Sequence, residues 1–207
     1  MNSGDLRVGL AQVNPTVGDL AGNRALILEY AKRAAGEGVN LLVFPEMVLT
    51  GYPIEDLALR PSFQQAVAES LQEIAVALKD EGAGDLAVVI GYLGRSSTAS
   101  IELGTPAGAP QNSLAIIYQG GIRAQYSKCH LPNYGVFDEY RYFVPGDKGL
   151  IARICGIDIA FAICEDLWRF DSVIKGYQVQ QPGALMVING SPYEQDKDDV
   201  RFSLCSQ

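Results

Sequence analysis

Ile157-Asp158-Ile159-Ala160-Phe161-Ala162-Ile163-Cys164-Glu165-Asp166-Leu167-Trp168 is the stretch that decides the expected fold. Apolar residues at 157, 159, 161 and 163 alternate with smaller ones, a pattern typical of a strand that is covered on both faces. The strand ends in a thiol followed by two carboxylates. Ligands of α/β proteins bind at the carboxyl ends of strands. Cys164 is therefore a candidate nucleophile, although a buried cysteine taken alone is more often a packed structural thiol.

Outward from this stretch, apolar strands alternate with segments of helical period. We expect helices from a cap at Asn23 to Ala35, from Pro61 to about Leu78, and over 171–180. Strands are expected at 6–13, 41–44, 86–92, 112–118, 121–127, 150–155, 157–163 and 184–189, with an exposed loop at 95–110. Helices alternate with buried strands early and hairpins follow, which predicts a layered α/β domain with a mixed sheet.

Composition excludes several classes of protein. The chain has 207 residues, 48% of them hydrophobic, which suits one domain with a full core. A net charge of −8 argues against a nucleic-acid or anionic-membrane partner. The sequence has no apolar run long enough to span a membrane, and no secretory signal is visible at its start. Four cysteines without paired spacing and one histidine argue against an ordinary zinc site and suggest reduced thiols in the cytoplasm.

Three polar residues follow the ends of expected strands: Glu46, Lys128 and Cys164. Each alone has an ordinary structural explanation, but together they supply what thiol chemistry on an amide requires. A carboxylate in a partly dry pocket can take the thiol proton, and a lysine ammonium favours the thiolate and then an oxyanion. A Cys-His dyad with His130 as the base is the competing account. The order of residues along the chain does not decide between them.

Three longer strings of residues carry a family resemblance. Pro45-Glu46-Met47 with Thr50-Gly51-Tyr52-Pro53, Lys128-Cys129-His130-Leu131-Pro132-Asn133-Tyr134, and Ile163-Cys164-Glu165-Asp166 resemble the nitrilase superfamily of carbon-nitrogen hydrolases. More narrowly they resemble the glutaminase domain of glutamine-dependent NAD+ synthetases, for which the segment 131–143 is the narrowest signal. The resemblance implies an α/β fold, the nitrilase-like αββα sandwich with mixed sheets, and a homo-oligomer that pairs such sandwiches.

The resemblance also implies roles for matching residues. Glu46 is expected to be the general base, Lys128 the oxyanion stabiliser and Cys164 the nucleophile, with the backbone N–H of Glu165 completing the oxyanion hole. Glu139 is expected to orient the lysine, and His130 has no catalytic role. The residues expected to hold or line the substrate are Tyr134, Ser191, Lys197, Glu165, Tyr52 and Trp168.

The function implied is hydrolysis of the side-chain amide of L-glutamine, without a metal or cofactor. The ammonia is expected to pass to a synthetase domain that uses ATP and Mg²⁺ to convert deamido-NAD+ to NAD+. Residues 1–207 lack that domain's Ser-Gly-Gly-x-Asp-Ser phosphate loop, and they end before the last strands expected of the glutaminase domain. Two other readings stay open: a stand-alone amidase acting on another small amide or nitrile, and a non-catalytic fragment that packs against a partner.

Overall fold

Two mixed β-sheets form the centre of the protein. The computed structural model describes residues 5–97, 108–169, 173–195 and 197–206. The larger sheet has the order β1 (Val8–Leu10), β2 (Leu41–Val43), β3 (Ala87–Arg95), β4 (Pro110–Tyr118) and β5 (Gly121–Ser127), and the smaller sheet has β6 (Leu150–Ile154), β7 (Ile157–Ile163) and β8 (Ala184–Ile188). The pairs β1–β2, β2–β3 and β7–β8 are parallel, and the hairpin pairs are antiparallel.

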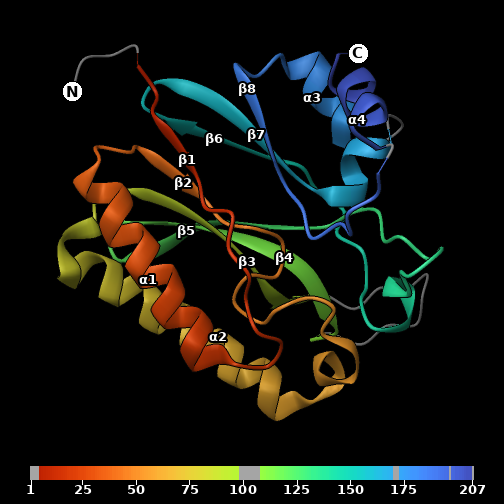
Figure 1. Ribbon diagram of the computed structural model, residues 1–207, viewed down its shortest axis with the longest axis horizontal. Coiled ribbons are helices and arrows are strands. Elements are labelled where there is room, and N and C mark those ends of the chain that lie inside the picture. Colours follow the sequence, from red (N-terminus) through yellow and green to blue (C-terminus); the bar gives the residue numbers. More distant parts are fainter. Residues whose placement is uncertain (1–4, 98–107, 170–172, 196, 207) are drawn as a thin grey trace.

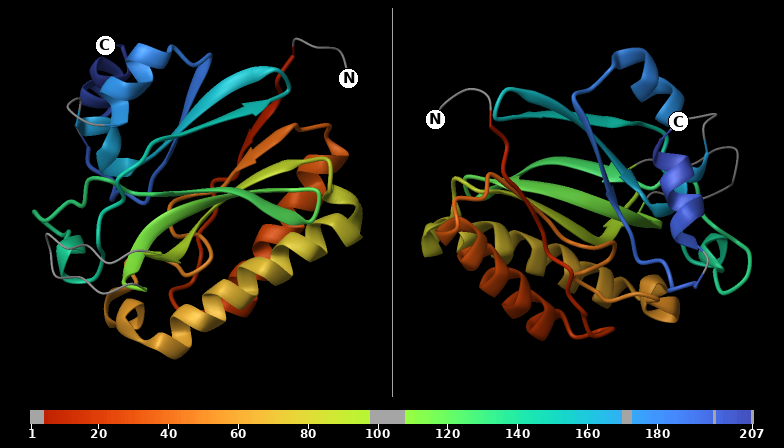
Figure 2. Two further views of the ribbon diagram at one scale, coloured as in Figure 1. Left: turned by 180° about the vertical axis from the view of Figure 1, so that it is seen from behind. Right: turned by 45° about the horizontal axis from the view of Figure 1, so that its top comes forward.

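Helices cover the outer face of each sheet, which gives the expected αββα order of layers (Figures 1 and 2). Helices α1 (Leu20–Gly36) and α2 (Pro61–Leu78) lie against the larger sheet, and α3 (Val173–Gln180) lies against the smaller one. The inner faces pack on each other because they carry apolar side chains: Ile159, Phe161 and Ile163 of β7 meet residues of β2, β3 and β4.

The opposite face of β7 explains its small residues. Ala160 and Ala162 are fully buried against Ile174 and Tyr177 of α3. Alanine leaves room for a helix to approach closely, and the Tyr177 hydroxyl donates to the carbonyl of Phe161 at 2.7 Å. The prediction that β7 is covered on both faces is confirmed.

The expected start of the first helix is wrong. Asp19, not Asn23, is the N-cap, because its carboxylate accepts a hydrogen bond from Gly22 N at 2.9 Å. Asn23 lies inside α1 and is buried. Its side chain bonds Thr16 N, Thr16 O and Leu49 O, so it anchors the segment before the helix instead of capping it.

The expected loop 95–110 is shorter than predicted, since β3 extends to Arg95 and β4 begins at Pro110. Two backbone hydrogen bonds close its base: Ser96 N to Ala109 O at 2.8 Å and Gly108 N to Ser96 O at 2.7 Å. Residues 98–107 lie outside the described residues. The first strand is likewise shorter than the expected 6–13.

A last helix, α4 (Lys197–Cys205), was not predicted. None of its described residues is buried, and Phe202 is 76% exposed. The helix has only nine residues, four of them charged, so its apolar pattern is too short to mark a helix in the sequence.

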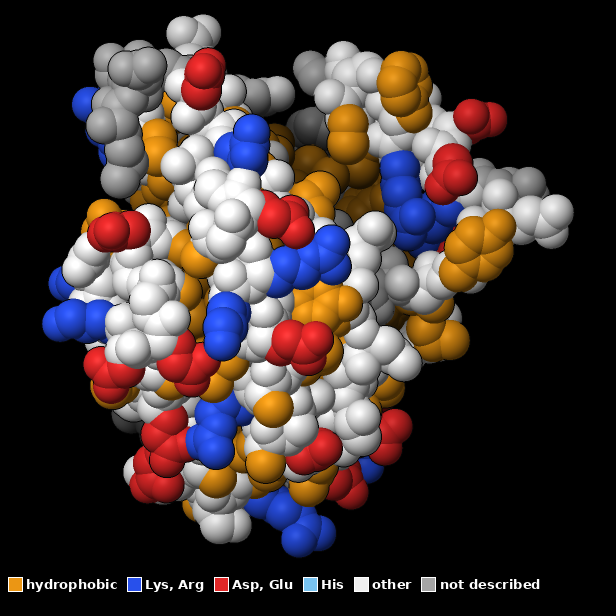
Figure 3. Space-filling view, turned by 60° about the vertical axis from the view of Figure 1, so that its left-hand side comes forward, with side chains coloured by type: hydrophobic (Ala, Val, Ile, Leu, Met, Phe, Trp, Pro, Cys, Tyr) orange, Lys and Arg blue, Asp and Glu red, His pale blue; other side chains and the backbone are white. Residues whose placement is uncertain are grey.

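Charged side chains of both signs are interspersed over the face drawn in Figure 3, where no extended basic surface forms. Among the described residues, no helix is both long and apolar enough to cross a membrane.

Candidate active site

A tight turn after β2 presents the first of the three expected residues. Glu46 follows Phe44-Pro45 and is only 3% exposed. The turn packs against β3 at Gly91, where a Cβ would collide with the backbone of Pro45 and Met47. Only glycine permits this approach. Glu46 is therefore fixed by backbone packing at the carboxyl end of a buried strand.

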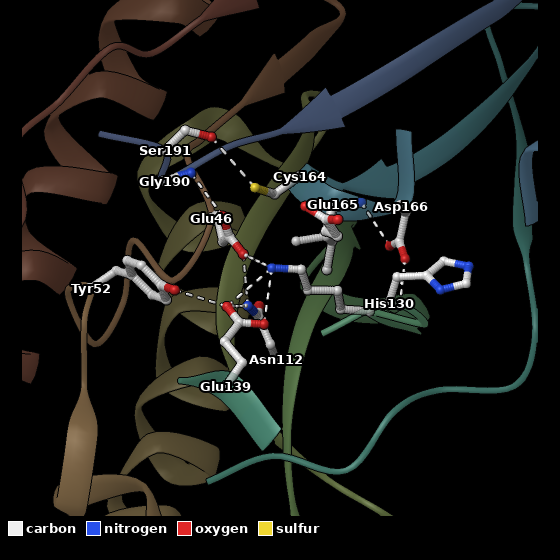
Figure 4. Close-up of polar contacts among 12 residues, drawn as sticks. Glu46, Tyr52, Asn112, His130, Glu139, Cys164, Glu165, Asp166, Gly190 and Ser191 are labelled. Carbon is white, nitrogen blue, oxygen red and sulfur yellow. Dashed lines mark hydrogen bonds and ion pairs between the residues drawn. The ribbon is translucent and has the colours of Figure 1, made fainter. Parts of the chain in front are cut away.

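Lys128 follows β5 and holds two buried carboxylates together. Its Nζ lies 2.8 Å from Oε1 of Glu46 and 3.0 Å from each oxygen of Glu139. The Nδ2 of Asn112 donates to Glu46 at 2.7 Å and to Glu139 at 3.3 Å, and the Tyr52 hydroxyl donates to Glu139 at 2.9 Å. Figure 4 shows the labelled members of this cluster converging from separate elements.

The charges in this cluster depend on one another. Burial alone would lower the pKa of Lys128, but Glu46 and Glu139 outweigh burial and raise the pKa above its ordinary value. Burial raises the pKa of Glu139, Lys128 opposes that rise, and Glu46 adds to it. The lysine is therefore a firmly charged ammonium in a nearly dry site, which strengthens its interaction with any developing negative charge.

Cys164 begins the short 3-10 helix η4 (Cys164–Trp168) directly after β7. Its φ is 48°, an uncommon conformation for a non-glycine residue and one that functional turns often hold. Its sulfur lies 3.4 Å from the Ser191 hydroxyl, and Gly190 N donates to Oε2 of Glu46 at 2.7 Å. The segment after β8 thus contacts both the thiol and the carboxylate.

The thiol is protonated at neutral pH. Burial raises the pKa of Cys164 to about 12, Glu46 adds to the rise, and Lys128 and Ser191 oppose it. The lysine favours the thiolate, as expected, but burial outweighs it. Nucleophilic attack from this thiol therefore requires a base.

Of the expected substrate residues, two lie beside the thiol turn. Glu165 is buried next to Cys164 and accepts a hydrogen bond from the Tyr134 hydroxyl at 2.7 Å. Its other oxygen lies 3.4 Å from Nε of Arg169. Tyr134 itself is 54% exposed, so this pair reaches from the buried site to solvent.

Two other expected substrate residues contact each other. The Lys197 ammonium lies 5.7 Å from the ring centroid of Trp168 and 2.9 Å from Oε1 of Glu194. These contacts do not join Lys197 to Cys164. Lys197 and Trp168 therefore form a separate pair. The other expected residues lie around one end of the two sheets: Glu46, Lys128, Glu139, Tyr52, Cys164, Glu165, Tyr134 and Ser191.

The family follows from this architecture and from a family comparison. The carbon-nitrogen hydrolase family model matches residues 7–198. The chain belongs to the carbon-nitrogen hydrolase family. Among curated relatives, the glutamine-dependent NAD(+) synthetase of Thermotoga maritima is 42% identical over 164 residues, which are 79% of this chain and 26% of that protein.

Solved structures agree with that family. The glutamine-dependent NAD+ synthetase of Acinetobacter baumannii, solved with ADP, is 32% identical with a TM-score of 0.83, covering 97% of this chain and 35% of that one. An amidase from Nesterenkonia sp. is 23% identical with a TM-score of 0.74, covering 99% and 72%. The amidase shows the shared fold alone. The chain spans about a third or less of the two synthetases.

The side chain of His130, the base of the competing Cys-His account, is not directed at Cys164 in this carbon-nitrogen hydrolase. Figure 4 shows its imidazole pointing away from Cys164, and its backbone N donates to Asp166 at 2.8 Å. The described residues contain no group of three or more His, Cys, Asp or Glu side chains that could hold a metal ion.

Sequence reasoning missed two buried residues of this carbon-nitrogen hydrolase. Asn112 is the third residue of β4 and bridges Glu46 and Glu139, and Asp166 accepts hydrogen bonds from the segment after Lys128. A polar residue at a buried strand position was the available signal for Asn112. The Glu165-Asp166 pair was visible, but nothing in its spacing indicated that the side chain of Asp166 points away from Cys164.

Proposed function

We propose that this domain hydrolyses the side-chain amide of L-glutamine and supplies the ammonia to a synthetase domain. One observation carries the proposal: a buried ion pair of Glu46 and Lys128, 2.8 Å apart, lies at the same strand ends as the buried thiol of Cys164. A base, a cation and a sulfur nucleophile are the groups that acyl transfer from an amide requires.

The first half of the reaction releases ammonia. Glu46 takes the proton of Cys164, and the sulfur bonds to the amide carbon of glutamine. The carbonyl electrons move onto oxygen, where the Lys128 ammonium and the Glu165 N–H stabilise them. Lys128 has three N–H donors, and its two carboxylate partners leave one for the oxyanion. Glu46 then gives the proton to the nitrogen, the C–N bond breaks, and ammonia leaves.

The second half restores the enzyme. Glu46 takes a proton from water, whose oxygen attacks the thioester carbon in the same oxyanion site. The C–S bond breaks, glutamate leaves, and the sulfur regains its proton from Glu46. In this sequence water supplies the oxygen and the proton that restores the thiol, and the residues transfer the protons, so the proposed hydrolysis has no step that calls for a cofactor.

The charged groups around the thiol suit an amino-acid head group. Ser191 borders the sulfur, and the buried carboxylate of Glu165 can pair with the α-ammonium of glutamine. Lys197, above Trp168, supplies the opposite charge for the α-carboxylate once it leaves Glu194. Tyr134 and Tyr52 then close the sides of the proposed binding site.

The proposal extends to a second domain, which would use the ammonia. The matched relatives are named for glutamine-dependent NAD+ synthesis, and this chain covers only their glutaminase-like part. We infer that the ammonia serves an ATP- and Mg²⁺-dependent amidation of deamido-NAD+ in a second domain, within a cytoplasmic homo-oligomer. The four free thiols agree with a reducing compartment.

Labelling of the four cysteines tests the proposed site. A glutamine-shaped diazo-ketone is expected to label Cys164, because binding concentrates the electrophile beside a thiol that Glu46 can deprotonate. Iodoacetamide is expected to label the exposed Cys155 and Cys205 first. Excess glutamine should protect Cys164 and leave Cys205 unchanged, as peptide mass mapping measures.

The same experiment separates the other two readings. Label on Cys205 with Cys164 untouched and no protection by glutamine would point to a non-catalytic fragment. Protection by simple amides but not by glutamine would point to a stand-alone amidase. A panel of amides, assayed for ammonia release, checks the second outcome.

Replacing Lys128 by methionine is expected to lower turnover by about 10²–10³-fold, since an oxyanion donor is lost. It should also slow alkylation of Cys164, because the cation that lowers its pKa is gone. Ammonia release and iodoacetamide kinetics measure the two effects. The variant leaves two buried carboxylates unpaired, at a cost of about 3–5 kcal/mol of stability, so thermal unfolding must confirm that it is folded. The exposed Lys148→Met is the matched control, and unchanged kinetics in Lys128→Met would remove Lys128 from the site.

A further inference from the structure

Asp166 is a fully buried carboxylate beside the site that the proposed reaction does not use. Its Oδ1 accepts hydrogen bonds from the backbone N of Cys129 at 3.0 Å and of His130 at 2.8 Å. Its Oδ2 accepts from the Tyr126 hydroxyl at 2.6 Å and from Ile163 N at 3.2 Å. Both oxygens of this carboxylate are therefore bonded to fixed donors, three of which are backbone groups.

These donors belong to the two segments that carry the reacting groups. Cys129 directly follows Lys128, and Ile163 directly precedes Cys164. The first segment leaves β5 in the larger sheet, and the second leaves β7 in the smaller sheet. Figure 4 shows the side chain of Asp166 pointing away from the thiol, toward the segment that holds His130.

Directional contacts are needed where two sheets meet at a site. The sheets pack through apolar side chains, and such packing has no preferred direction. Catalytic groups must be held within about 0.5 Å of their productive geometry, which requires hydrogen bonds from supporting residues. Asp166 supplies hydrogen bonds of this kind across the two sheets.

The bond to Ile163 adds a second constraint. It spans the start of η4, where Cys164 has a φ of 48°. A non-glycine residue in that conformation costs about 1–3 kcal/mol and persists only when its surroundings hold it. Asp166 thus contributes to the turn that points the thiol into the site.

We propose that Asp166 is a positioning residue that fixes Lys128 relative to Cys164 by bonding the segments of both. The inference rests on the proposed thiol chemistry, and Asp166 acts through the two catalytic residues without touching the substrate. Asp166→Asn keeps the shape but turns one acceptor oxygen into an N–H₂ group. Whichever way the amide lies, that group faces two donors, and one pair of bonds is lost.

Two measurements test the proposal. For glutamine hydrolysis, Asp166→Asn is expected to lower kcat by about 10²-fold, as expected when an oxyanion donor is misplaced, with KM changed by only a few-fold. Alkylation of Cys164 by iodoacetamide needs no assumption about the substrate. It is expected to slow by about 10-fold, which corresponds to a rise of one unit in the pKa of Cys164. Removing the charge of Asp166 would by itself favour the thiolate, so slower alkylation reports the displaced lysine.

A double-mutant cycle separates positioning from simple stability. In the Lys128→Met background, Asp166→Asn should slow alkylation hardly further, because the residue through which it acts is gone. Leu71→Ala, buried in α2 away from the site, is the control: it should lower the unfolding temperature and leave both kinetic readouts unchanged. Additive effects, or an equal kinetic loss in Leu71→Ala, would overturn the proposal.

A milder variant covers the case in which Asp166→Asn does not fold. Tyr126→Phe removes one of the four bonds and leaves the three backbone donors in place. It should slow alkylation of Cys164 measurably and leave that of Cys205 unchanged. An unchanged rate at Cys164 would count against positioning. Slower alkylation with no glutamine hydrolysis in the parent protein would keep the positioning role and reject the proposed substrate.

Discussion

Cys164→Ala is expected to lower glutamine hydrolysis by roughly 10⁶-fold, the scale at which loss of a nucleophile removes covalent catalysis altogether. The alanine fills almost the same buried space after β7, so folding should be little affected. Glutamine should still bind, because the groups proposed to hold it are intact. Ammonia release measures the first effect and calorimetric titration with glutamine the second.

The exposed Cys205 at the end of α4 supplies the matched control. Cys205→Ala should hydrolyse glutamine at the parent rate. Intact-mass analysis of the parent during turnover should detect a thioester that the Cys164→Ala protein lacks. Normal turnover in Cys164→Ala would return Cys164 to the role of a packed structural thiol.

Local pattern predicted most of the fold. The strands that deliver the candidate residues were found because each is a short apolar run that ends in a turn signal. The alternation from 157 to 163 also predicted that β7 lies between two layers, which the packing of Phe161 and Ala162 confirms. Periodicity predicts these elements because a strand or helix that buries one face carries apolar residues at regular spacing.

Elements that bury little could not be found in the same way. Helix α4 has only nine residues, four of them charged and none buried, so its sequence gives too short an apolar pattern to mark a helix. The first helix is capped by Asp19 instead of Asn23. Both residue types can cap a helix, and only the tertiary contacts of Asn23 with Thr16 and Leu49 decide between them. Sequence alone cannot weigh those distant contacts.

The candidate site likewise contains residues that the sequence predicts and residues that only the tertiary contacts reveal. Glu46, Lys128 and Cys164 were predicted as strand-end residues, and family resemblance added Glu139. The bridge made by Asn112 depends on the register of β4 against β3 and on two carboxylates far away in sequence. Such a contact has no local signature. The roles of all these residues stay predictions until the variants are measured.

Because the thiol of Cys164 is protonated, its reaction depends on a base. A cysteine whose pKa lies at about 12 is almost entirely protonated at neutral pH, so attack depends on transfer of that proton. Lys128 alone cannot supply the thiolate, because burial, the largest influence on the pKa of Cys164, outweighs the effect of its charge. A carboxylate at the position of Glu46 is the proton acceptor that this arrangement offers.

Glu46→Gln is therefore expected to lower glutamine hydrolysis by roughly 10²–10⁴-fold, since the amide keeps the shape but cannot accept the proton. Its effect should include thioester hydrolysis, because the same carboxylate activates water. His130→Ala is the matched control and should cost far less, because the imidazole points away from Cys164. Rates of ammonia release compare the two variants, with thermal unfolding to confirm that each is folded. A crippled His130→Ala beside a mildly affected Glu46→Gln would favour the Cys-His dyad over the Glu-Lys-Cys site.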